Sequence, residues 1–293
     1  MRNLDPLKKR YQDIPIPAEL DDVVNQALKA SKRKDVRTMK SVKWAVGTAA
    51  AAAVIFVGSV NASPAVVNAL SDVPVLSSIV KVVTFRDFKV DEGNYNADLK
   101  VPAIKDMDNQ LLEEQLNSKY VQENKELYQA FMKEMEQQQK AGGGHLGVNS
   151  GYEVKTDNDS ILSIERYVNK TMGSTEEILQ FDTIDKKNEV LLTLPSLFKD
   201  DSYISLISSN IKEQMEAQMK KDENKTYWIG ENAVDGDAFT SIKADQNFYI
   251  NNEGKLVISF NKYEVAPGSM GSVEFVIPTD AIANALVSHA YVK

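Results

Sequence analysis

The hydrophobic pattern of the chain is dominated by one uninterrupted stretch. Residues 44–71 carry no charge, and their first half is rich in alanine, valine, isoleucine and phenylalanine. About 20 apolar residues suffice for a helix that crosses the core of a bilayer, and Pro64 should end such a helix. A buried core helix seldom lacks a polar face over this length, and a signal peptide has a shorter basic leader. The pattern therefore predicts a single transmembrane helix over residues 44–62.

The pattern before this stretch predicts one short amphipathic helix. Leu20, Val23, Val24 and Leu28 recur at spacings of three and four, after an acidic first turn. A helix this short is stable only when its apolar face is buried. The inner membrane surface could cover that face, but the acidic turn favours a protein that receives the helix in a groove. We therefore interpret residues 1–43 as a short helical cytoplasmic tail with a protein partner.

The pattern after residue 72 alternates between helical and strand periods. Residues 107–139 and 202–221 have hydrophobic positions every three or four residues, which predicts two long helices. Thr279 is expected to cap a short closing helix. Together these features predict an α+β domain with an antiparallel sheet. Runs rich in β-branched and aromatic residues predict strands at residues 95–104, 151–156, 160–171, 177–187, 246–251, 255–266 and 271–278, with a hairpin turn at 252–254.

The charges are distributed unevenly along the chain. The net charge is -8, but residues 1–43 carry eleven Lys and Arg against six Asp and Glu, a balance of +5. The remaining charges put -13 on residues 72–293. Cytoplasmic flanks of membrane spans carry an excess of Lys and Arg. The chain is therefore predicted to be a single-pass protein of the cell membrane, with a cytoplasmic N-terminus and an extracellular C-terminal domain.

Residue types that serve most kinds of catalysis are scarce. The chain has no cysteine and only two histidines, His145 and His289. These counts exclude a disulfide scaffold, a thiolate zinc site, a cysteine nucleophile and a metal centre with three histidines. Gly142, Gly144 and Gly147 match a dinucleotide-binding fingerprint by letter, but they follow a predicted helix and precede a predicted strand, which is the wrong order. We expect no enzyme, no catalytic residue, no cofactor and no metal site, although a pair of catalytic carboxylates stays open.

A candidate proteolytic site lies just beyond the predicted span. Signal peptidase requires small or aliphatic residues at the first and third positions before the bond that it cuts. Val67 and Ala69 meet this requirement, which predicts cleavage between Ala69 and Leu70. Val60 and Ala62 also meet it, but that bond is less suitable because it lies nearer the bilayer and is followed by a serine and a proline.

Several segments of the outer part are typical of one family. They include TIDKKNEVLLTLPSLFKD at residues 183–200 and KYEVAPG at residues 262–268. With the basic tail and the single span, they resemble the RsiV family of anti-sigma factors, whose outer part is a domain of DUF3298 type. The resemblance covers essentially the whole chain. It implies a tail that sequesters an extracytoplasmic-function sigma factor, and an outer domain that is a receptor for lysozyme.

The resemblance also implies a signalling mechanism without direct contact to nucleic acid. In this family, ligand binding exposes the outer site to signal peptidase, and an intramembrane protease then cuts the remaining span and frees the sigma factor. Val67 and Ala69 match the first cleavage position, and the amphipathic face of the tail would bind the sigma factor. The implied domains are the sigma-factor-binding tail (1–43), the transmembrane helix (44–62), a membrane-proximal segment with the cleavage site (63–85) and the extracellular ligand-binding domain (86–293).

Two other functions stay open. The same domain type resembles an accessory part of peptidoglycan deacetylases, so the alternative is a membrane-anchored protein that modifies the cell wall. Such an enzyme would need a cluster of acid, base or metal ligands, for which the sequence offers no clear candidates. A passive tether would need no amphipathic helix in the tail.

Two turns between predicted strands are candidates for contact with lysozyme, a strongly cationic protein that the acidic outer part would attract. The turn at residues 263–271 is expected to protrude because it contains a proline followed by a glycine, and its aromatic and methionine side chains could serve as apolar anchors. The competing interpretation is that both turns are ordinary hairpin connections. The residues expected to contact the ligand are Tyr263, Pro267, Gly268 and Met270 in residues 263–271, and Gly173 and Ser174 in residues 171–176.

Overall fold

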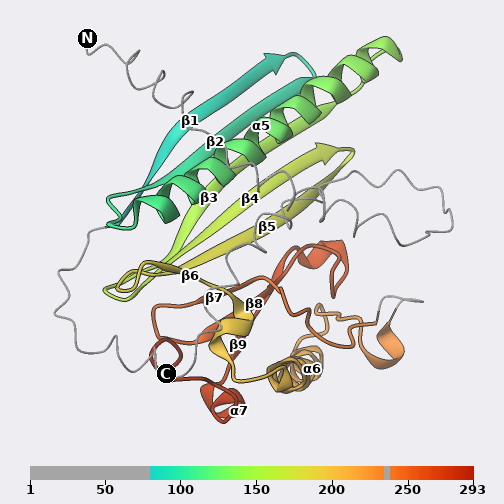
Figure 1. Ribbon diagram of the computed structural model, residues 1–293. Coiled ribbons are helices and arrows are strands. Elements are labelled where there is room, and N and C mark those ends of the chain that lie inside the picture. The colour runs from blue at the N-terminus through green and yellow to red at the C-terminus, as the bar shows by residue number, and fades with distance from the viewer. Residues whose placement is uncertain (1–79, 234–237) are drawn as a thin grey trace, which may run out of the picture. The chain divides into compact units, whose positions relative to one another are not determined.

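The computed structural model describes residues 80–233 and 238–293. The predicted sigma-binding face, transmembrane helix and cleavage site all lie outside these residues. Within the described ranges, no helix is both long enough and apolar enough to cross a membrane. The described residues form an α+β fold, as predicted, with two sheets and two long helices (Figure 1).

The first sheet contains six strands in chain order. All neighbouring pairs are antiparallel except β2 and β3, which are parallel. The chain passes through helix α5 (Gln110–Lys140) between these two strands, and such a crossover returns the chain in the same direction. The predicted antiparallel sheet is therefore correct for every pair but this one. The strands are β1 (Lys81–Glu92), β2 (Tyr95–Lys105), β3 (Leu146–Asp157), β4 (Ile161–Met172), β5 (Ser174–Asp185) and β6 (Val190–Leu192).

Helix α5 lies across one face of this sheet, over β2 and β3 (Figure 1). Of the hydrophobic positions that predicted the helix, it buries Leu112, Tyr120 and Phe131 among others. The predicted start at residue 107 was too early, because Asp106 has a positive φ of 67° and Asn109 is the N-cap. The Asn109 side chain accepts a hydrogen bond from the Leu112 N–H at 3.1 Å, which satisfies a donor of the first turn.

A residue from a distant part of the sequence also caps α5. Glu189, in the turn between β5 and β6, accepts hydrogen bonds from the N–H groups of Asp108, at 2.8 Å, and Asn109. The carboxylate is favourable there because the N-terminal end of a helix carries a partial positive charge. Glu189 adopts a positive φ of 49°, which is uncommon for a residue with a side chain. The turn after β5 therefore holds the first turn of α5.

Strand β1 is an outer strand of the six-stranded sheet. It runs across the predicted boundary between residues 85 and 86, and Phe85 is the additional residue of a β-bulge. Val80, just before the strand, is buried at 3% exposure in a cluster with Met107 and Leu112 beneath α5. The folded part of the chain therefore begins no later than Val80.

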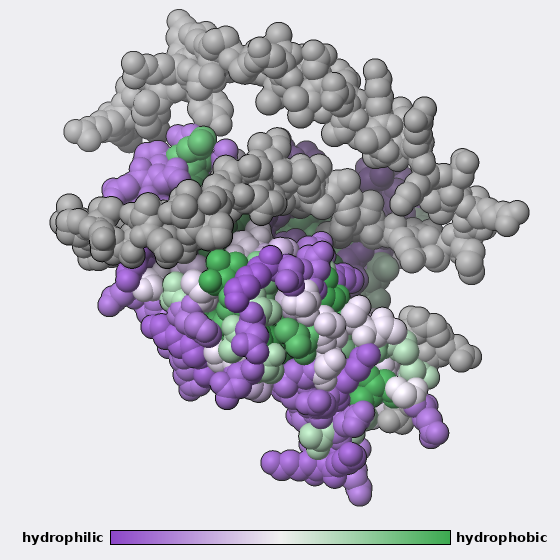
Figure 2. Space-filling model, turned by 60° about the horizontal axis from the view of Figure 1, so that its bottom comes forward, coloured by the Kyte–Doolittle hydropathy of each residue, from purple (hydrophilic) through white to green (hydrophobic). Residues whose placement is uncertain are grey.

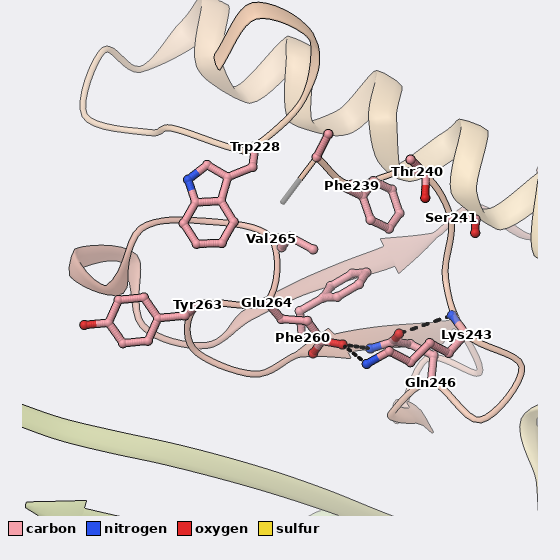
Figure 3. Close-up of a pocket in the computed structure, with 11 residues that line it drawn as sticks. Trp228, Phe239, Thr240, Ser241, Lys243, Gln246, Phe260, Tyr263, Glu264 and Val265 are labelled. Carbon is pink, nitrogen blue, oxygen red and sulfur yellow. Dashed lines mark hydrogen bonds and ion pairs between the residues drawn. The ribbon is translucent and has the colours of Figure 1, made fainter. Parts of the chain in front are cut away.

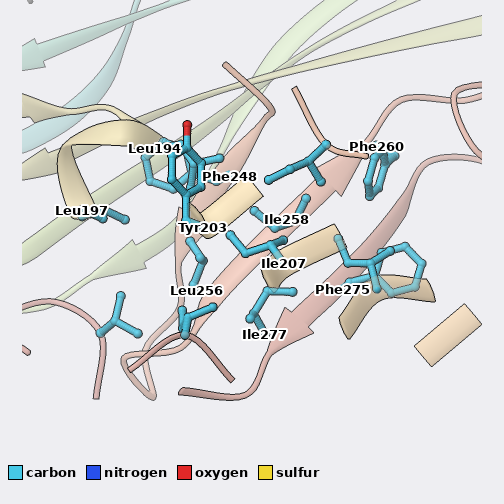
Figure 4. Close-up of a cluster of buried hydrophobic side chains, with 14 of the residues drawn as sticks. Leu194, Leu197, Tyr203, Ile207, Phe248, Leu256, Ile258, Phe260, Phe275 and Ile277 are labelled. Atoms are coloured by element: carbon cyan, nitrogen blue, oxygen red, sulfur yellow. The ribbon is translucent and has the colours of Figure 1, made fainter. Parts of the chain in front are cut away.

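The C-terminal part contains a three-stranded antiparallel sheet that packs against helix α6. Helix α6 begins and ends at the predicted residues and buries Ile207, which lies near Ile258 and Ile277 of the sheet (Figure 4). The elements after β6 are η2 (Leu194–Leu197), α6 (Ser202–Lys221), η3 (Gly230–Asn232), β7 (Phe248–Ile250), β8 (Leu256–Phe260), η4 (Gly268–Met270), β9 (Val273–Ile277) and α7 (Thr279–Ile282).

Two local predictions in this part were wrong. The strand predicted over residues 255–266 ends at Phe260, because the chain turns at Tyr263, whose φ is +66°. Thr279 does not cap the closing helix: it is the first residue of α7, and Pro278 is the N-cap. The Thr279 hydroxyl instead donates a hydrogen bond to the carbonyl of Lys293 at 2.5 Å, so it holds the C-terminal residue.

Candidate ligand-contact surface

The two turns that the sequence proposes separately lie side by side. The Lys262 ammonium, in the connection between β8 and β9, donates a hydrogen bond to the Thr175 carbonyl at 2.6 Å. The Ser272 hydroxyl, in the same connection, donates to the Glu177 carboxylate at 2.7 Å. Both acceptors belong to the start of β5, just after the β4–β5 turn. The β4–β5 turn and the β8–β9 connection therefore form one surface, which we call the two-turn surface.

The β4–β5 turn is tight and fully exposed. Met172 pairs with Ser174 across Gly173, whose φ of +82° is a conformation that favours glycine. The hydroxyls of Thr171 and Thr175 lie 3.1 Å apart and hold the strand ends together. The Met172 side chain is 51% exposed, so the turn presents a flexible apolar group to solvent.

In the β8–β9 connection, Tyr263 is held in a strained conformation with its ring exposed. Its φ is +66°, and its side chain is 54% exposed. A Cβ atom at Gly268 would overlap the ring of Tyr263, so only glycine lets the ring lie there. The Lys262 ammonium lies 5.2 Å from the ring centroid. Strained residues persist where the surroundings stabilise them, and they are often found at functional sites.

The rest of this connection folds inward instead of protruding. Val265 and Ala266 are each 2% exposed and belong to the C-terminal core. Met270 packs against the same core, and its sulfur accepts a hydrogen bond from the Thr226 N–H at 3.3 Å. Pro267 and Gly268 are half-buried. The connection therefore presents Tyr263 outward and Met270 inward, so Tyr263 is the exposed apolar group of the predicted pair.

Beside Tyr263 lies a pocket of about 260 Å³ (Figure 3). Trp228 and Tyr263 stand at one side, and Phe239 and Phe260 form an aromatic floor with ring centroids 5.5 Å apart. The backbone N–H of Trp228 donates to the Val265 carbonyl at 2.9 Å, which ties the tryptophan to the β8–β9 connection. On the face of the molecule that Figure 2 shows, hydrophobic patches are small and are separated by hydrophilic residues.

A cluster of charged side chains is buried between α5 and the six-stranded sheet. Arg166 of β4 donates to the Asp182 carboxylate of β5 at 3.0 Å and to the carboxylate of Glu123 of α5. Lys119 of α5 donates to Asp182 at 2.9 Å, and the Arg166 guanidinium lies 4.6 Å from the ring centroid of Tyr120. Burial by itself would raise the pKa of Asp182, but Arg166 and Lys119 outweigh it and lower that pKa to about 2. The cluster is therefore charged at neutral pH and ties α5 to the sheet.

Over its whole length the chain is similar to Anti-sigma-V factor RsiV of Bacillus subtilis (strain 168). The two are 43% identical over 292 residues, which covers 100% of this chain and 99% of that protein. The chain belongs to the RsiV family of anti-sigma factors. An RsiV-type anti-sigma factor is a regulator and not an enzyme, and its partner is a sigma factor.

The fold of this chain is also similar to solved structures. Residues 195–280 match the family described as Protein of unknown function (DUF3298). The crystal structure of a DUF3298 family member from Bacteroides fragilis has a TM-score of 0.52 and 17% identity, over 73% of this chain and 96% of that one. A DUF3298 family protein from Pseudomonas aeruginosa PAO1 has a TM-score of 0.48 and 13% identity, over 76% of this chain and 99% of that one. The Bacteroides fragilis structure is similar to 73% of this chain, so the likeness in fold extends beyond residues 195–280.

Several residues of this RsiV-type domain carried no signal in the sequence. The pocket residues Trp228 and Phe239 come from irregular connections, where no periodicity marks them, and Gln246 begins the strand predicted over residues 246–251 but lies just before β7. His145 and His289 are both exposed. Within residues 80–233 and 238–293, no three His, Asp or Glu side chains are arranged to hold a metal ion.

Proposed function

We propose that this protein is a transmembrane anti-sigma factor and a receptor for lysozyme. Its cytoplasmic tail sequesters an extracytoplasmic-function sigma factor of the sigma-V kind through Leu20, Val23, Val24 and Leu28. Lysozyme binding to the extracellular domain lets signal peptidase cut after Ala69, and an intramembrane protease then frees the sigma factor. The observation that carries this proposal is the 43% identity to Anti-sigma-V factor RsiV, because it extends over the tail, the apolar stretch and the outer domain alike.

The two-turn surface supports a role in binding a protein ligand. Hot spots of protein interfaces are enriched in tyrosine and tryptophan, and a ring that is already held in a fixed position loses little entropy on binding. Tyr263 meets this description, because Gly268 and the positive φ define where its ring lies. Met172 adds a flexible apolar group on the neighbouring turn. The charge of -13 on residues 72–293 supports fast association with a cationic protein.

The position of Val80 supports coupling between the domain and the cleavage site. Val80 is buried beneath the first turn of α5, and it lies ten positions after Leu70. An extended chain spans at most about 3.6 Å per residue, so the bond after Ala69 lies within roughly 40 Å of this anchor. A change in how Val80 is held would therefore alter how far the bond can move from the folded domain.

Binding of lysozyme to the full chain in detergent micelles, measured by surface plasmon resonance, tests the receptor. Tyr263→Ala should weaken binding by at least about tenfold, mainly through faster dissociation, because an interface hot spot is lost. Phe85→Ala is the matched control, since Phe85 is 56% exposed but lies in β1, outside the two-turn surface. Raising the salt concentration should slow association. Equal loss in both variants would contradict the assignment of the surface.

Analysis of the cleavage products in cells tests the proposed proteolytic step. With lysozyme added, the released outer fragment should begin at Leu70, and Ala69→Trp should prevent release while lysozyme still binds, because signal peptidase requires a small residue there. A fragment that begins at Ser63 would move the site to Val60 and Ala62. An intact chain after lysozyme treatment would reject the proteolytic mechanism.

The sigma-binding face is tested by a reporter of sigma-dependent transcription. Replacing Val24 and Leu28 by Asp should free the sigma factor, because charged side chains are costly in an apolar groove. Inhibition equal to that of the parent chain would show that this face is not the contact.

A further inference from the structure

We propose that the pocket beside Tyr263 binds an N-acetylated sugar. The pocket combines aromatic side chains with uncharged hydrogen-bonding groups, which is the chemistry that recognises a pyranose ring: its C–H faces pack on aromatic rings, and its hydroxyls need donors and acceptors. The inference does not depend on the protein ligand, because a sugar contacts the pocket itself and not the two-turn surface as a whole.

The aromatic side chains provide a wall and a floor. Trp228 and Tyr263 flank the opening, while Phe239 and Phe260 are 8% and 1% exposed and close the bottom (Figure 3). The floor belongs to the C-terminal core, so it is rigid before any ligand arrives. Sites for drug-sized ligands measure about 300–1,000 Å³. A pocket of about 260 Å³ is below that range and suits a single sugar ring with its substituent.

The polar groups stand opposite the two flanking rings. Gln246 is 5% exposed, and its amide N–H₂ donates to the Ser259 carbonyl at 2.9 Å and to the Glu264 carboxylate at 3.4 Å. Its oxygen accepts from the Lys243 N–H at 3.4 Å, so these three hydrogen bonds set the orientation of the amide. The second lone pair of that oxygen is the group left to accept from the N–H of an acetamido group. The hydroxyls of Thr240 and Ser241 line the pocket and make no hydrogen bond within the described ranges, so both are available to sugar hydroxyls.

Charged ligands fit the pocket less well. The Glu264 carboxylate accepts hydrogen bonds from the Lys243 ammonium and the Asn261 N–H, each at 2.9 Å. Its charge is therefore already paired, and the pair presents no net charge to a ligand. An uncharged ligand avoids the cost of desolvating an ion against this pair.

The test uses the full chain in detergent micelles with Trp44→Phe and fluorotryptophan, so that Trp228 carries the only fluorine, because the chain has two tryptophans. A β-1,4-linked trimer of N-acetylglucosamine should shift the ¹⁹F NMR signal in a saturable way, with a Kd of about 1 mM, since about fifteen heavy atoms of one ring contact the pocket. Cellotriose, which lacks the acetamido groups, should bind at least about tenfold more weakly.

Variants localise the effect. Tyr263→Ala should raise the Kd about tenfold, and the combined change of Thr240 and Ser241 to Ala should raise it about threefold or more, while Phe85→Ala should leave it unchanged. No saturable shift with the trimer, or equal binding of cellotriose, would overturn the proposal. A shift of the Trp228 signal by lysozyme alone, with none from the trimer, would assign the pocket to a side chain of the protein ligand and also overturn it, while leaving the receptor function intact.

Discussion

The six-stranded and the three-stranded sheet each pack against one long helix, but the two cores differ in chemistry. Beneath α5, Arg166 and Asp182 form a buried ion pair that Lys119 and Glu123 extend. The buried side chains of α6 carry no charge, and apart from one serine they are hydrophobic. A buried ion pair adds little net stability, yet loss of one partner is costly. Helix α5 is therefore held partly by charge, and α6 by apolar burial.

This difference bears on the proposed switch. The β8–β9 connection with Tyr263 belongs to the apolar C-terminal part, which suits a rigid surface for a ligand. Val80, which leads back to the proposed cleavage site, is anchored beneath helix α5, whose packing includes the buried ion pair. We expect the α5 region to be the more responsive of the two, and the following predictions test that expectation.

The largest expected effect is the loss of Asp182. Asp182→Ala leaves the buried Arg166 with Glu123 alone and removes the carboxylate that pairs with Lys119, so the free energy of unfolding should fall by about 3–5 kcal/mol. Urea denaturation measures this change. Asp157→Ala is the control, because Asp157 pairs with Lys186 but is 53% exposed, and it should cost less than about 1 kcal/mol. Equal losses in the two variants would remove the special role of the buried cluster.

A cavity beneath α6 should have a smaller effect that does not depend on pH. Ile211 is 0% exposed, so Ile211→Ala should lower the free energy of unfolding by about 3 kcal/mol, through lost burial and an unfilled cavity. Ile204→Ala removes a partly buried side chain of the same helix and should cost less. A loss for Ile211→Ala that differs between pH 7 and acid would contradict the apolar character of this core.

Acid should weaken the α5 region selectively. The pKa of Asp182 is lowered from 3.8 to about 2 in the folded state, so its stabilisation is complete above the unfolded value and is lost as the pH falls from about 4 to 2. The shift corresponds to about 2 kcal/mol. Protection of backbone amides from hydrogen exchange, relative to the intrinsic rate at each pH, should therefore fall first in α5, β4 and β5 as the pH is lowered. If the amides of α6 lost protection before those of α5, the α5 region would not be the more acid-sensitive of the two.

The smallest expected effect concerns the cap of α5. Glu189→Ala leaves the N–H groups of Asp108 and Asn109 without their carboxylate, and the free energy of unfolding should fall by about 1 kcal/mol. Hydrogen exchange should rise in the first turn of α5. Glu253→Ala, in an exposed turn, is the control and should change neither quantity. If hydrogen exchange in the first turn of α5 were unchanged in Glu189→Ala, Asn109 alone would be sufficient to cap the helix.

Local patterns were sufficient for most elements of the fold. Helix α6 has the predicted ends because its hydrophobic positions recur at helical spacing. The turn at residues 252–254 is confirmed: Gly254 has a φ of +72°, and the Asn251 N–H donates to the Lys255 carbonyl at 2.9 Å. These features depend on residues close together in the sequence, and the sequence therefore contains their physical cause.

Other features depend on which distant segments meet, and no local pattern carries that information. The alternation in β4 and β5 shows that these strands have two faces, but it does not show that Arg166 and Asp182 point under the same helix. Glu189 lies 80 residues from Asn109, and the pocket joins Trp228 to Gln246 across an irregular connection. The sequence by itself determined the elements, the charge distribution and the family. The tertiary structure alone decided that the two candidate turns form one surface, because strand order and packing arise from contacts between segments far apart in the chain.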